Sequence, residues 1–444
     1  MTTAEISPTG DIADDEHRRQ LRRALLASAV GTTIEWYDFI VYGTVSGLVF
    51  GKLFFPQASP VGGILQAFAI FFIGFASRPL GAAIFGHWGD RIGRKATLIA
   101  TLVVTGIATV AVGLVPTYAT IGIWGAVLLT ILRTLQGIGV GGEWGGSVLL
   151  AMEWARTTQN RGFLTSWPQF GAPAGLFLAN GIVLFFSWLS GDQFLTWGWR
   201  IPFLLSIVMI GIGLWIRLGI LETPVFRRLV HEERIERVPV LEVFKRQPKQ
   251  VILSAVLRMP EQGAGVIVVF FIFTYATAFL GISKNFVLTA AIVQCFLGFL
   301  WVVAAGTLSD RVGRKNMYMI GSLSVAVYAF IYFALLNTKV PSLMFVAIAL
   351  SLIPIMTCYG PEAALIAESF TPRLRYSGTS IGYHLASIFA GGPAPFIATA
   401  LFARFHSSLP IALYMVGCAV IGIVATALMT DYTGKAISAE YENV

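Results

Sequence analysis

Seven ionisable side chains lie inside long apolar stretches of this 444-residue sequence. They are Glu35, Asp38, Arg78, Arg133, Glu143, Arg258 and Glu261. Charges in such surroundings are costly, and they usually face a cavity or pair with one another. Each of the seven therefore has two interpretations, a functional site or a structural ion pair between helices.

Two of these acids share the segment GTTIEWYDFIVYG, residues 31–43. Glu35 and Asp38 are three positions apart, which places them about 60° apart on one helical face. Two such carboxylates repel each other, and removal from water also favours protonation of at least one. A carboxyl that gains and loses a proton is what a proton-coupled carrier needs. We therefore predict proton coupling at Asp38, helped by Glu35, with structural pairing to arginines as the alternative.

The other acids favour structural roles. Arg258 and Glu261 flank Pro260 three positions apart, so they can satisfy each other where proline frees a carbonyl group. A kinked gate is the functional alternative for that pair. Glu143 is predicted to form an ion pair between helices.

The elements that must position these charges are membrane-spanning helices. The chain is 56% hydrophobic and 12% charged, about half the charged fraction of a soluble domain. A spanning helix needs about 20 apolar residues, and closed barrels would show short alternating strands instead. We expect an all-α polytopic membrane protein with twelve spans near 24–50, 62–86, 97–115, 121–152, 162–188, 201–219, 249–280, 287–308, 317–337, 341–367, 376–403 and 409–430.

Basic residues predict the orientation. Most arginines and lysines fall in the N-terminal segment and in the even-numbered loops, including the cluster 217–249. Because basic loops stay in the cytoplasm, we expect both termini there, in the inner (plasma) membrane. The net charge of +8 then reflects topology, and no nucleic acid is expected as a partner. The polar first twenty residues do not resemble a cleaved signal peptide.

An internal repeat divides the chain. GDRIGRK at 89–95 returns as SDRVGRK at 309–315, and GAPAG at 171–175 returns as GGPAP at 391–395. Both offsets are 220 residues, so two parallel six-helix halves are expected. The predicted organisation is a cytoplasmic segment 1–23, halves at 24–219 and 249–430, a cytoplasmic connector 220–248 and a cytoplasmic tail 431–444.

These segments resemble a known family. GHWGDRIGRK is similar to the signature loop between spans two and three of the major facilitator superfamily, and RTLQGIGVGGEWGG resembles its fourth-span signature. With GTTIEWYDFIVYG and WGWRIPF, the chain resembles the metabolite:proton symporters, which carry oxoglutarate, shikimate, citrate, and proline or betaine. The resemblance implies two pseudo-symmetric halves with substrate bound between them. It also implies proton-coupled import of a small metabolite that carries a carboxylate.

The resemblance also implies roles for individual residues. Arg78 and Arg200 are candidate ligands of a substrate carboxylate, with an interfacial anchor as the alternative for Arg200. Arg133 is a candidate for proton coupling, with helix pairing as the alternative. Asp90 and Arg94, with Asp310 and Arg314 as their repeat, are candidates for a latch on the cytoplasmic side. Polar residues that are candidates for lining the cavity are Tyr37, Tyr42, Trp167, Gln169, Tyr275, Tyr359 and His384.

Other readings of the sequence are weaker. GIGVGG and GTSIG lie inside spans, where they lack the strand context of a dinucleotide site or a nucleophile elbow. No Walker motif occurs, and the three cysteines are too far apart for a metal site. We expect no enzyme activity, cofactor, metal or obligate protein partner. A channel is the rival of a different class, and a uniporter, antiporter or exporter is the rival within transporters.

Overall fold

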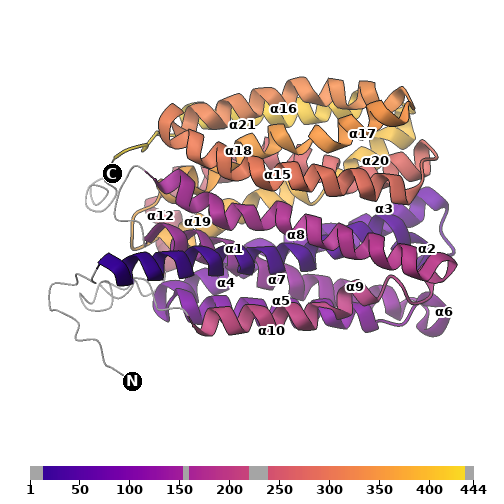
Figure 1. Ribbon diagram of the computed structural model, residues 1–444, viewed down its shortest axis with the longest axis horizontal. Helices are drawn as coiled ribbons and strands as arrows, with labels where there is room; N and C mark the ends of the chain where they lie inside the picture. The colour runs from indigo at the N-terminus through magenta and orange to yellow at the C-terminus, as the bar shows by residue number, and fades with distance from the viewer. Residues whose placement is uncertain (1–13, 154–159, 220–238, 436–444) are drawn as a thin grey trace.

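A computed structural model describes residues 14–153, 160–219 and 239–435, and its regular elements in these ranges are helical. The helices lie side by side along the long axis of the molecule (Figure 1). Eleven of them, within the described part of the chain, are long and apolar enough to cross a membrane. The first helix, which contains five acidic residues, is additional to these eleven. The expectation of an all-α membrane protein is confirmed.

We call the helices before residue 220 the N-terminal half. They are α1 (Asp14–Val45), α2 (Gly51–Phe54), α3 (Pro60–Ala76), α4 (Arg78–Arg91), α5 (Arg94–Leu114), α6 (Tyr118–Ile121), α7 (Trp124–Glu153), α8 (Arg161–Ser190), α9 (Ile201–Leu204) and α10 (Ser206–Leu218).

The described helices after residue 238 are α12 (Pro239–Arg246), which lies within the expected connector 220–248, and those of the C-terminal half. The helices of the C-terminal half are α13 (Pro248–Leu257), α14 (Ile272–Thr274), α15 (Lys284–Val312), α16 (Arg314–Asn337), α17 (Pro341–Leu350), α18 (Leu352–Ala367), α19 (Arg375–Ala386), α20 (Ala394–Phe405) and α21 (Leu409–Leu428).

Local sequence explains where the helices begin and where they break. Pro60, Pro248 and Pro341 each stand in the first turn of a helix, where the missing amide N–H costs nothing. The expected second span is interrupted at Ser77, which separates α3 from α4. The first helix starts at Asp14, so it extends into the segment that the sequence assigned to the polar N-terminus.

The two repeated loops have the same backbone conformation. Gly93 has a φ of 117° and Gly313 a φ of 93°, and each separates two helices. Positive φ values of this kind are strained for residues with a Cβ atom. The glycine is therefore required at the same place in both copies, which explains why GRK recurs in each.

Irregular helical turns are concentrated in the seventh and eleventh spans. The seventh contains wide π-helical turns at Pro260–Ala264, Ile267–Phe271 and Tyr275–Phe279, and the eleventh contains one at Ser387–Gly391 before Pro393. Such turns are often found at functional sites. In contrast, α8 continues through Pro168 and Pro173.

The outer surface of the bundle is apolar. Large exposed side chains include Trp188, Trp215 and Ile207, each more than 60% exposed. A soluble protein rarely shows so much apolar surface, so this belt is suited to lipid. Helix α1 begins, and helix α21 ends, at the same end of the bundle, which we call the terminal side (Figure 1).

Candidate functional site

Close contacts between glycines and neighbouring helices position two buried arginines of the N-terminal half, Arg78 and Arg133. Gly141 of α7 lies against the backbone of Arg78, and Gly74 of α3 lies against the side chain of Arg133. A Cβ atom at either glycine would collide with these groups. The glycine-rich fourth span is thus a packing surface, as expected for small residues in membrane helices.

Arg78 is a buried cation that contacts no counter-ion among the described residues. Its side chain is 1% exposed, and its guanidinium carbon lies 4.0 Å from the ring centre of Phe39 and 4.4 Å from that of Phe75. Trp36 lies further away, at 5.7 Å. Within the described residues, Arg78 forms no hydrogen bond, and its Nε atom is buried without a partner. Aromatic faces stabilise this cation and leave its donor groups available.

Arg133 lies on the other side of the same aromatic group. Its guanidinium carbon is 3.9 Å from the ring centre of Phe39 and 4.3 Å from that of Tyr42. Nη1 donates to Gln136 Oε1 at 3.0 Å, whereas Nε and Nη2 have no partner among the described residues. The two arginines therefore sit close together with donors unused.

The two acids of α1 are both buried but differently placed. Asp38 is 1% exposed, and its Oδ1 accepts a hydrogen bond of 2.6 Å from Ser206 of α10. Its Oδ2 and the Oε2 of Glu35 have no partner in the described structure. Neither acid forms an ion pair with Arg78 or Arg133 in the described part of the chain, so the structural-pair alternative lacks its expected contact.

A chain of polar side chains leads from Asp38 toward Arg133. The Thr109 hydroxyl lies beside Asp38, and Gln136 Nε2 donates to Thr109 Oγ1 at 2.7 Å. Gln136 in turn accepts from Arg133 at 3.0 Å. Because the Thr109 hydroxyl donates to the Thr105 carbonyl oxygen at 2.9 Å, Thr109 and Gln136 fill the space between Asp38 and Arg133 without a continuous run of hydrogen bonds.

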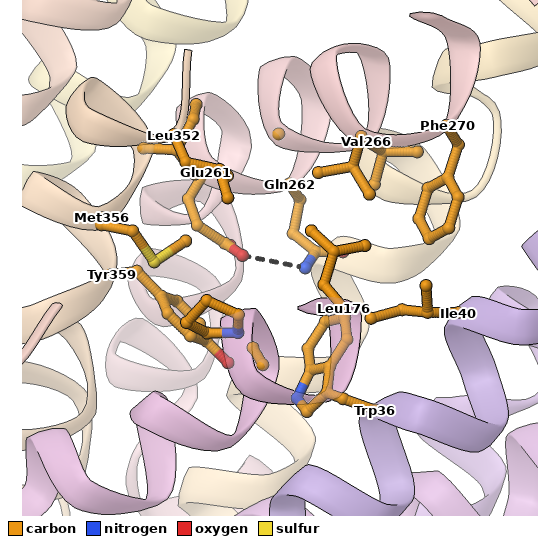
Figure 2. Close-up of a pocket in the computed structure, with 15 residues that line it drawn as sticks. Trp36, Ile40, Leu176, Glu261, Gln262, Val266, Phe270, Leu352, Met356 and Tyr359 are labelled. Carbon is orange, nitrogen blue, oxygen red and sulfur yellow. Dashed lines mark hydrogen bonds between the residues drawn. The ribbon is translucent and has the colours of Figure 1, made fainter. Parts of the chain in front are cut away.

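A cavity of about 60 Å³ lies between the two halves, bounded by α1 and α8 on one side and by the seventh span and α18 on the other. Figure 2 shows Trp36, Ile40 and Leu176 facing Glu261 and Gln262 across it. Most of the remaining wall is aliphatic or aromatic. Apolar walls with a few polar groups are typical of small-molecule sites.

Only Tyr359, among the residues predicted to bind substrate, lines this cavity. Arg78 is one aromatic ring away, because it approaches Trp36, which forms part of the wall. Glu261 and Gln262 are polar wall residues that the sequence did not assign to a substrate site. Both residues belong to the π-helical turn Pro260–Ala264, and no sequence pattern predicted that turn.

Arg258 forms the expected bond with Glu261, and it has a second partner. Its Nη2 donates to Glu261 Oε2 at 2.9 Å, and its Nε donates to Glu362 Oε1 at 2.7 Å. Glu362 lies on α18, 104 positions away in the sequence. All three side chains are nearly or fully buried. We call them the C-half triad.

A network of rings and amides joins the two halves beside the cavity. Gln169 of α8 accepts a bond of 2.6 Å from Trp144 and donates one of 2.9 Å to the Tyr359 carbonyl oxygen. The Trp144 ring stacks on Tyr383 of α19, with ring centres 3.4 Å apart. Arg258 lies over the Tyr383 ring at 3.2 Å. This network couples the C-half triad to the interface between the halves.

His384 stands next to this network and is fully enclosed. Its two ring nitrogens have no hydrogen-bond partner among the described residues. Ser380 and Ser387 lie one helical turn before and after His384, and their hydroxyls also have no partner in that part of the structure. These orphan groups mark a polar region near the cavity, where bound water or substrate atoms would satisfy them.

Some predicted site residues lie elsewhere. Arg200 donates from Nη1 to the carbonyl oxygens of Gly113 and Val115, both at 2.8 Å, and therefore ties the end of α5 to the segment before α9. Tyr37 donates to the Pro202 carbonyl at 2.5 Å. Neither lines the cavity. Tyr42 is buried beneath Arg133.

The two repeated acids bind across the halves on the terminal side. Asp90 at the end of α4 accepts from the backbone N–H of Ser377 at 3.1 Å and from its hydroxyl at 2.7 Å. Asp310 near the end of α15 accepts from the N–H groups of Gly162 and Phe163, both at 2.9 Å. Each acid thus meets the first turn of a helix in the opposite half, where negative charge is favourable.

Arg314 reinforces the second of these contacts. It pairs with Asp310 at 3.0 Å and with Glu368 at 2.6 Å, and Glu368 also pairs with Arg161 of α8 at 3.3 Å. We call these contacts, with those of Asp90, the terminal-side latch. Arg94 begins α5, but its side chain lies outside the described part of the structure.

We expect Asp90→Asn to open the terminal side. The substitution removes the charge from two hydrogen bonds, and charged hydrogen bonds contribute about 1.5–3 kcal/mol each. A Ser166→Cys reporter, buried in α8, should then react roughly tenfold faster with a bulky thiol reagent. Asp192→Asn, on an exposed turn, is the matched control. Unchanged reactivity in Asp90→Asn would argue that these contacts do not hold the halves together.

The partner of Glu143 was not foreseen. Its carboxylate pairs with Arg217 of α10, and Thr101 donates to it at 2.7 Å. The sequence placed Arg217 in a basic cytoplasmic cluster, but its side chain is only 2% exposed. The interhelix pair predicted for Glu143 is therefore present, whereas the interpretation of Arg217 as a loop charge is wrong.

A family model and several known transporters match nearly the whole chain. The family model described as "Sugar (and other) transporter" matches residues 24–238 and 227–436. The inner membrane metabolite transport protein YhjE of Escherichia coli is 40% identical over 91% of this chain and 93% of that protein. The Escherichia coli shikimate transporter is 39% identical over 92% and 94%, and the proline/betaine transporter 33% over 94% and 85%.

A solved structure has the same fold. The proton:xylose symporter XylE, bound to 6-bromo-6-deoxy-D-glucose, superimposes with a TM-score of 0.76 at 19% identity. The match covers 95% of this chain and 98% of that one. These relatives and neighbours are transporters and not enzymes. By its repeated loops, its two halves and these matches, the chain belongs to the sugar (and other) transporter family of the major facilitator superfamily, together with these metabolite transporters.

Proposed function

We propose that this transporter imports a small carboxylate metabolite together with protons, by alternating access in the inner membrane. Its relatives include a shikimate transporter and proline/betaine transporters, whose named substrates all carry a carboxylate. Both termini would lie in the cytoplasm, as the distribution of basic residues predicts.

The observation that carries this proposal is the buried guanidinium of Arg78. It lies on aromatic rings beside the interface between the halves and donates no hydrogen bond within the described residues. A fully buried arginine normally requires a partner, because desolvation of its charge is expensive. Its planar fork matches a carboxylate. A substrate carboxylate would supply the missing partner, with Trp36 moving aside to join Arg78 to the cavity.

The energy for accumulation would come from protons that bind Asp38. Its partly unpaired carboxylate and the polar side chains between it and Arg133 support a site that changes charge during transport. One charge crossing a potential of 100 mV contributes about 2.3 kcal/mol. This energy corresponds to about a fiftyfold concentration ratio for a zwitterionic substrate that crosses with one proton. A monoanionic substrate with one proton crosses without net charge, so the pH gradient alone would drive its accumulation.

Alternating access would use the terminal-side latch. If the termini are cytoplasmic, the latch contacts of Asp90 and Asp310 close the cytoplasmic side in the described conformation. Release of substrate would then require these contacts to break and the Trp144–Tyr383 stack to separate. The π-helical turns of the seventh and eleventh spans supply places where the helices can bend.

A two-stage experiment tests the proposal. Shikimate, proline, betaine and a panel of dicarboxylates and uncharged polyols are first screened for thermal stabilisation of the purified protein. A ligand at a hundredfold excess over its Kd should stabilise the fold by about 2.7 kcal/mol. The best ligand is then offered to vesicles with an imposed inward proton gradient. We expect accumulation that a protonophore abolishes.

The rival functions give different results in the same experiment. A uniporter would equilibrate the ligand without accumulating it, and an antiporter or exporter would accumulate it only when the proton gradient is reversed. A channel would show no counterflow of labelled for unlabelled ligand. Stabilisation by uncharged polyols alone would contradict the assignment of a carboxylate substrate.

A further inference from the structure

The C-half triad has an unequal number of charges. Two carboxylates, Glu261 and Glu362, share the single guanidinium of Arg258. Arg258 and Glu362 are fully buried, and Glu261 is 6% exposed. With both acids ionised, the triad would therefore carry one uncompensated negative charge out of contact with bulk water.

The hydrogen bonds of the triad do not remove this imbalance. Arg258 gives one donor to each acid and a third, from Nη1, to the Tyr383 carbonyl oxygen at 2.5 Å. Gln262 donates to Glu261 Oε1 at 3.2 Å. The second oxygen of Glu362, Oε2, is buried with no partner among the described residues. A proton is added at the lowest energetic cost to a carboxylate oxygen that accepts no hydrogen bond.

The surroundings supply no second cation in contact. The titratable and charged groups that face the triad from α16, α18, α19 and α4 are Tyr318, Cys358, Tyr359, Tyr383, His384 and Arg78. From α21, Tyr414 and Cys418 approach the π-helical turn that carries Glu261. Only Arg78 is a permanent cation, and it acts on Glu261 from the opposite half without forming an ion pair.

We propose that Glu261 and Glu362 together bind one exchangeable proton, which makes the C-half triad a second proton-binding site, separate from Asp38. A shared proton leaves Arg258 with one carboxylate and one neutral acid, and this removes the cost of an unpaired buried charge. Two acids around one guanidinium titrate as a unit, so the proton belongs to the pair. Glu261 lines the cavity and provides the route by which the proton enters.

The position of the site links it to transport, and this step rests on the proposed function. While Arg78 has no ligand, its field partly offsets the excess charge of Glu261. A substrate carboxylate on Arg78 would cancel that field and favour proton uptake by the triad. Substrate and proton would then bind together, as symport requires. The Arg258 guanidinium also lies over the Tyr383 ring, so the charge of the triad can influence the stacking of Tyr383 on Trp144.

Infrared difference spectroscopy of the full-length protein in lipid tests the site with protons alone. Protonated carboxyls are identified by a carbonyl stretch that shifts when water is replaced by D₂O. The measurement is made at neutral pH in an Asp38→Asn background, so that Asp38 cannot contribute and the role of Asp38 in coupling does not affect the result. Glu261→Gln and Glu362→Gln are compared with this parent.

We expect each single substitution to abolish the same carbonyl signal. Either glutamine leaves one acid facing one guanidinium, so the remaining carboxylate stays ionised. Glu143→Gln is the matched control, because Glu143 is equally buried but pairs with one guanidinium, that of Arg217, and it should leave the signal unchanged. A signal that persists in both variants would overturn the proposal, and loss in only one would overturn a shared site.

Thermal unfolding provides a second measurement and reports whether the variants fold. Each single glutamine variant should unfold near the parent temperature, because its charges balance. The double variant Glu261→Gln/Glu362→Gln should unfold at a clearly lower temperature, because Arg258 then has no carboxylate. Equal stability of the single and double variants would contradict the charge imbalance on which the proposal depends.

Discussion

Replacing Arg78 with lysine should weaken binding of the carboxylate ligand by more than about tenfold, while leaving the fold intact. A charged hydrogen bond contributes about 1.5–3 kcal/mol, and an ammonium group cannot reproduce the two parallel bonds of a guanidinium. The aromatic rings of Phe39 and Phe75 would still accommodate a cation. Isothermal titration of the purified variant with the ligand found in the thermal screen measures the effect.

Arg200→Lys is the matched control for this prediction. Arg200 undergoes the same chemical change, but its donors hold the carbonyl oxygens of Gly113 and Val115, away from the cavity. Replacing Arg200 with lysine should lower the stability of the fold modestly and leave the affinity for the ligand unchanged. If Arg78→Lys binds the ligand as tightly as the parent, Arg78 is not in the substrate site. Weakened binding in Arg200→Lys alone would move the site to the end of α5.

The sequence predicts the fold well because the fold depends on features that a linear pattern records. Long apolar runs indicate spanning helices, and a 220-residue repeat indicates two halves. The equivalent glycines Gly93 and Gly313, with their positive φ values, show that the repeat is structural. The bonds of Asp90 and Asp310 across the halves follow from the same symmetry.

The site is less predictable because its contacts join distant segments. Glu362 meets Arg258 across 104 positions, and Arg217 meets Glu143 across 74. Arg217 also lies near the end of the predicted span 201–219, where a basic residue normally indicates the start of a loop. Helical periodicity places Glu35 and Asp38 on one face, but it does not say which neighbours that face meets. The π-helical turn at Glu261 further alters the rotation of the helix at the cavity.

Replacing Asp38 with asparagine should abolish proton-driven accumulation and preserve exchange. Asparagine has the shape of the protonated acid, so Ser206 can still donate to its oxygen, as it does to Asp38 at 2.6 Å. An ionised acid would be costly in a closed, dehydrated intermediate, and the neutral amide avoids that cost. The variant should therefore exchange labelled for unlabelled ligand. It should not concentrate ligand, because it has no proton to release.

Comparison with three other variants separates proton coupling from general damage. Glu35→Gln should show a milder defect, mainly a shift in the pH dependence of uptake, because Glu35 is near Asp38 but outside the chain through Thr109 and Gln136 to Arg133. Gln136→Leu should interrupt that chain and slow accumulation while Asp38 remains intact. Asp192→Asn, on an exposed turn, should behave as the parent. If Asp38→Asn still concentrates ligand when protons are the only driving force, coupling must reside elsewhere, and the C-half triad becomes the site to test.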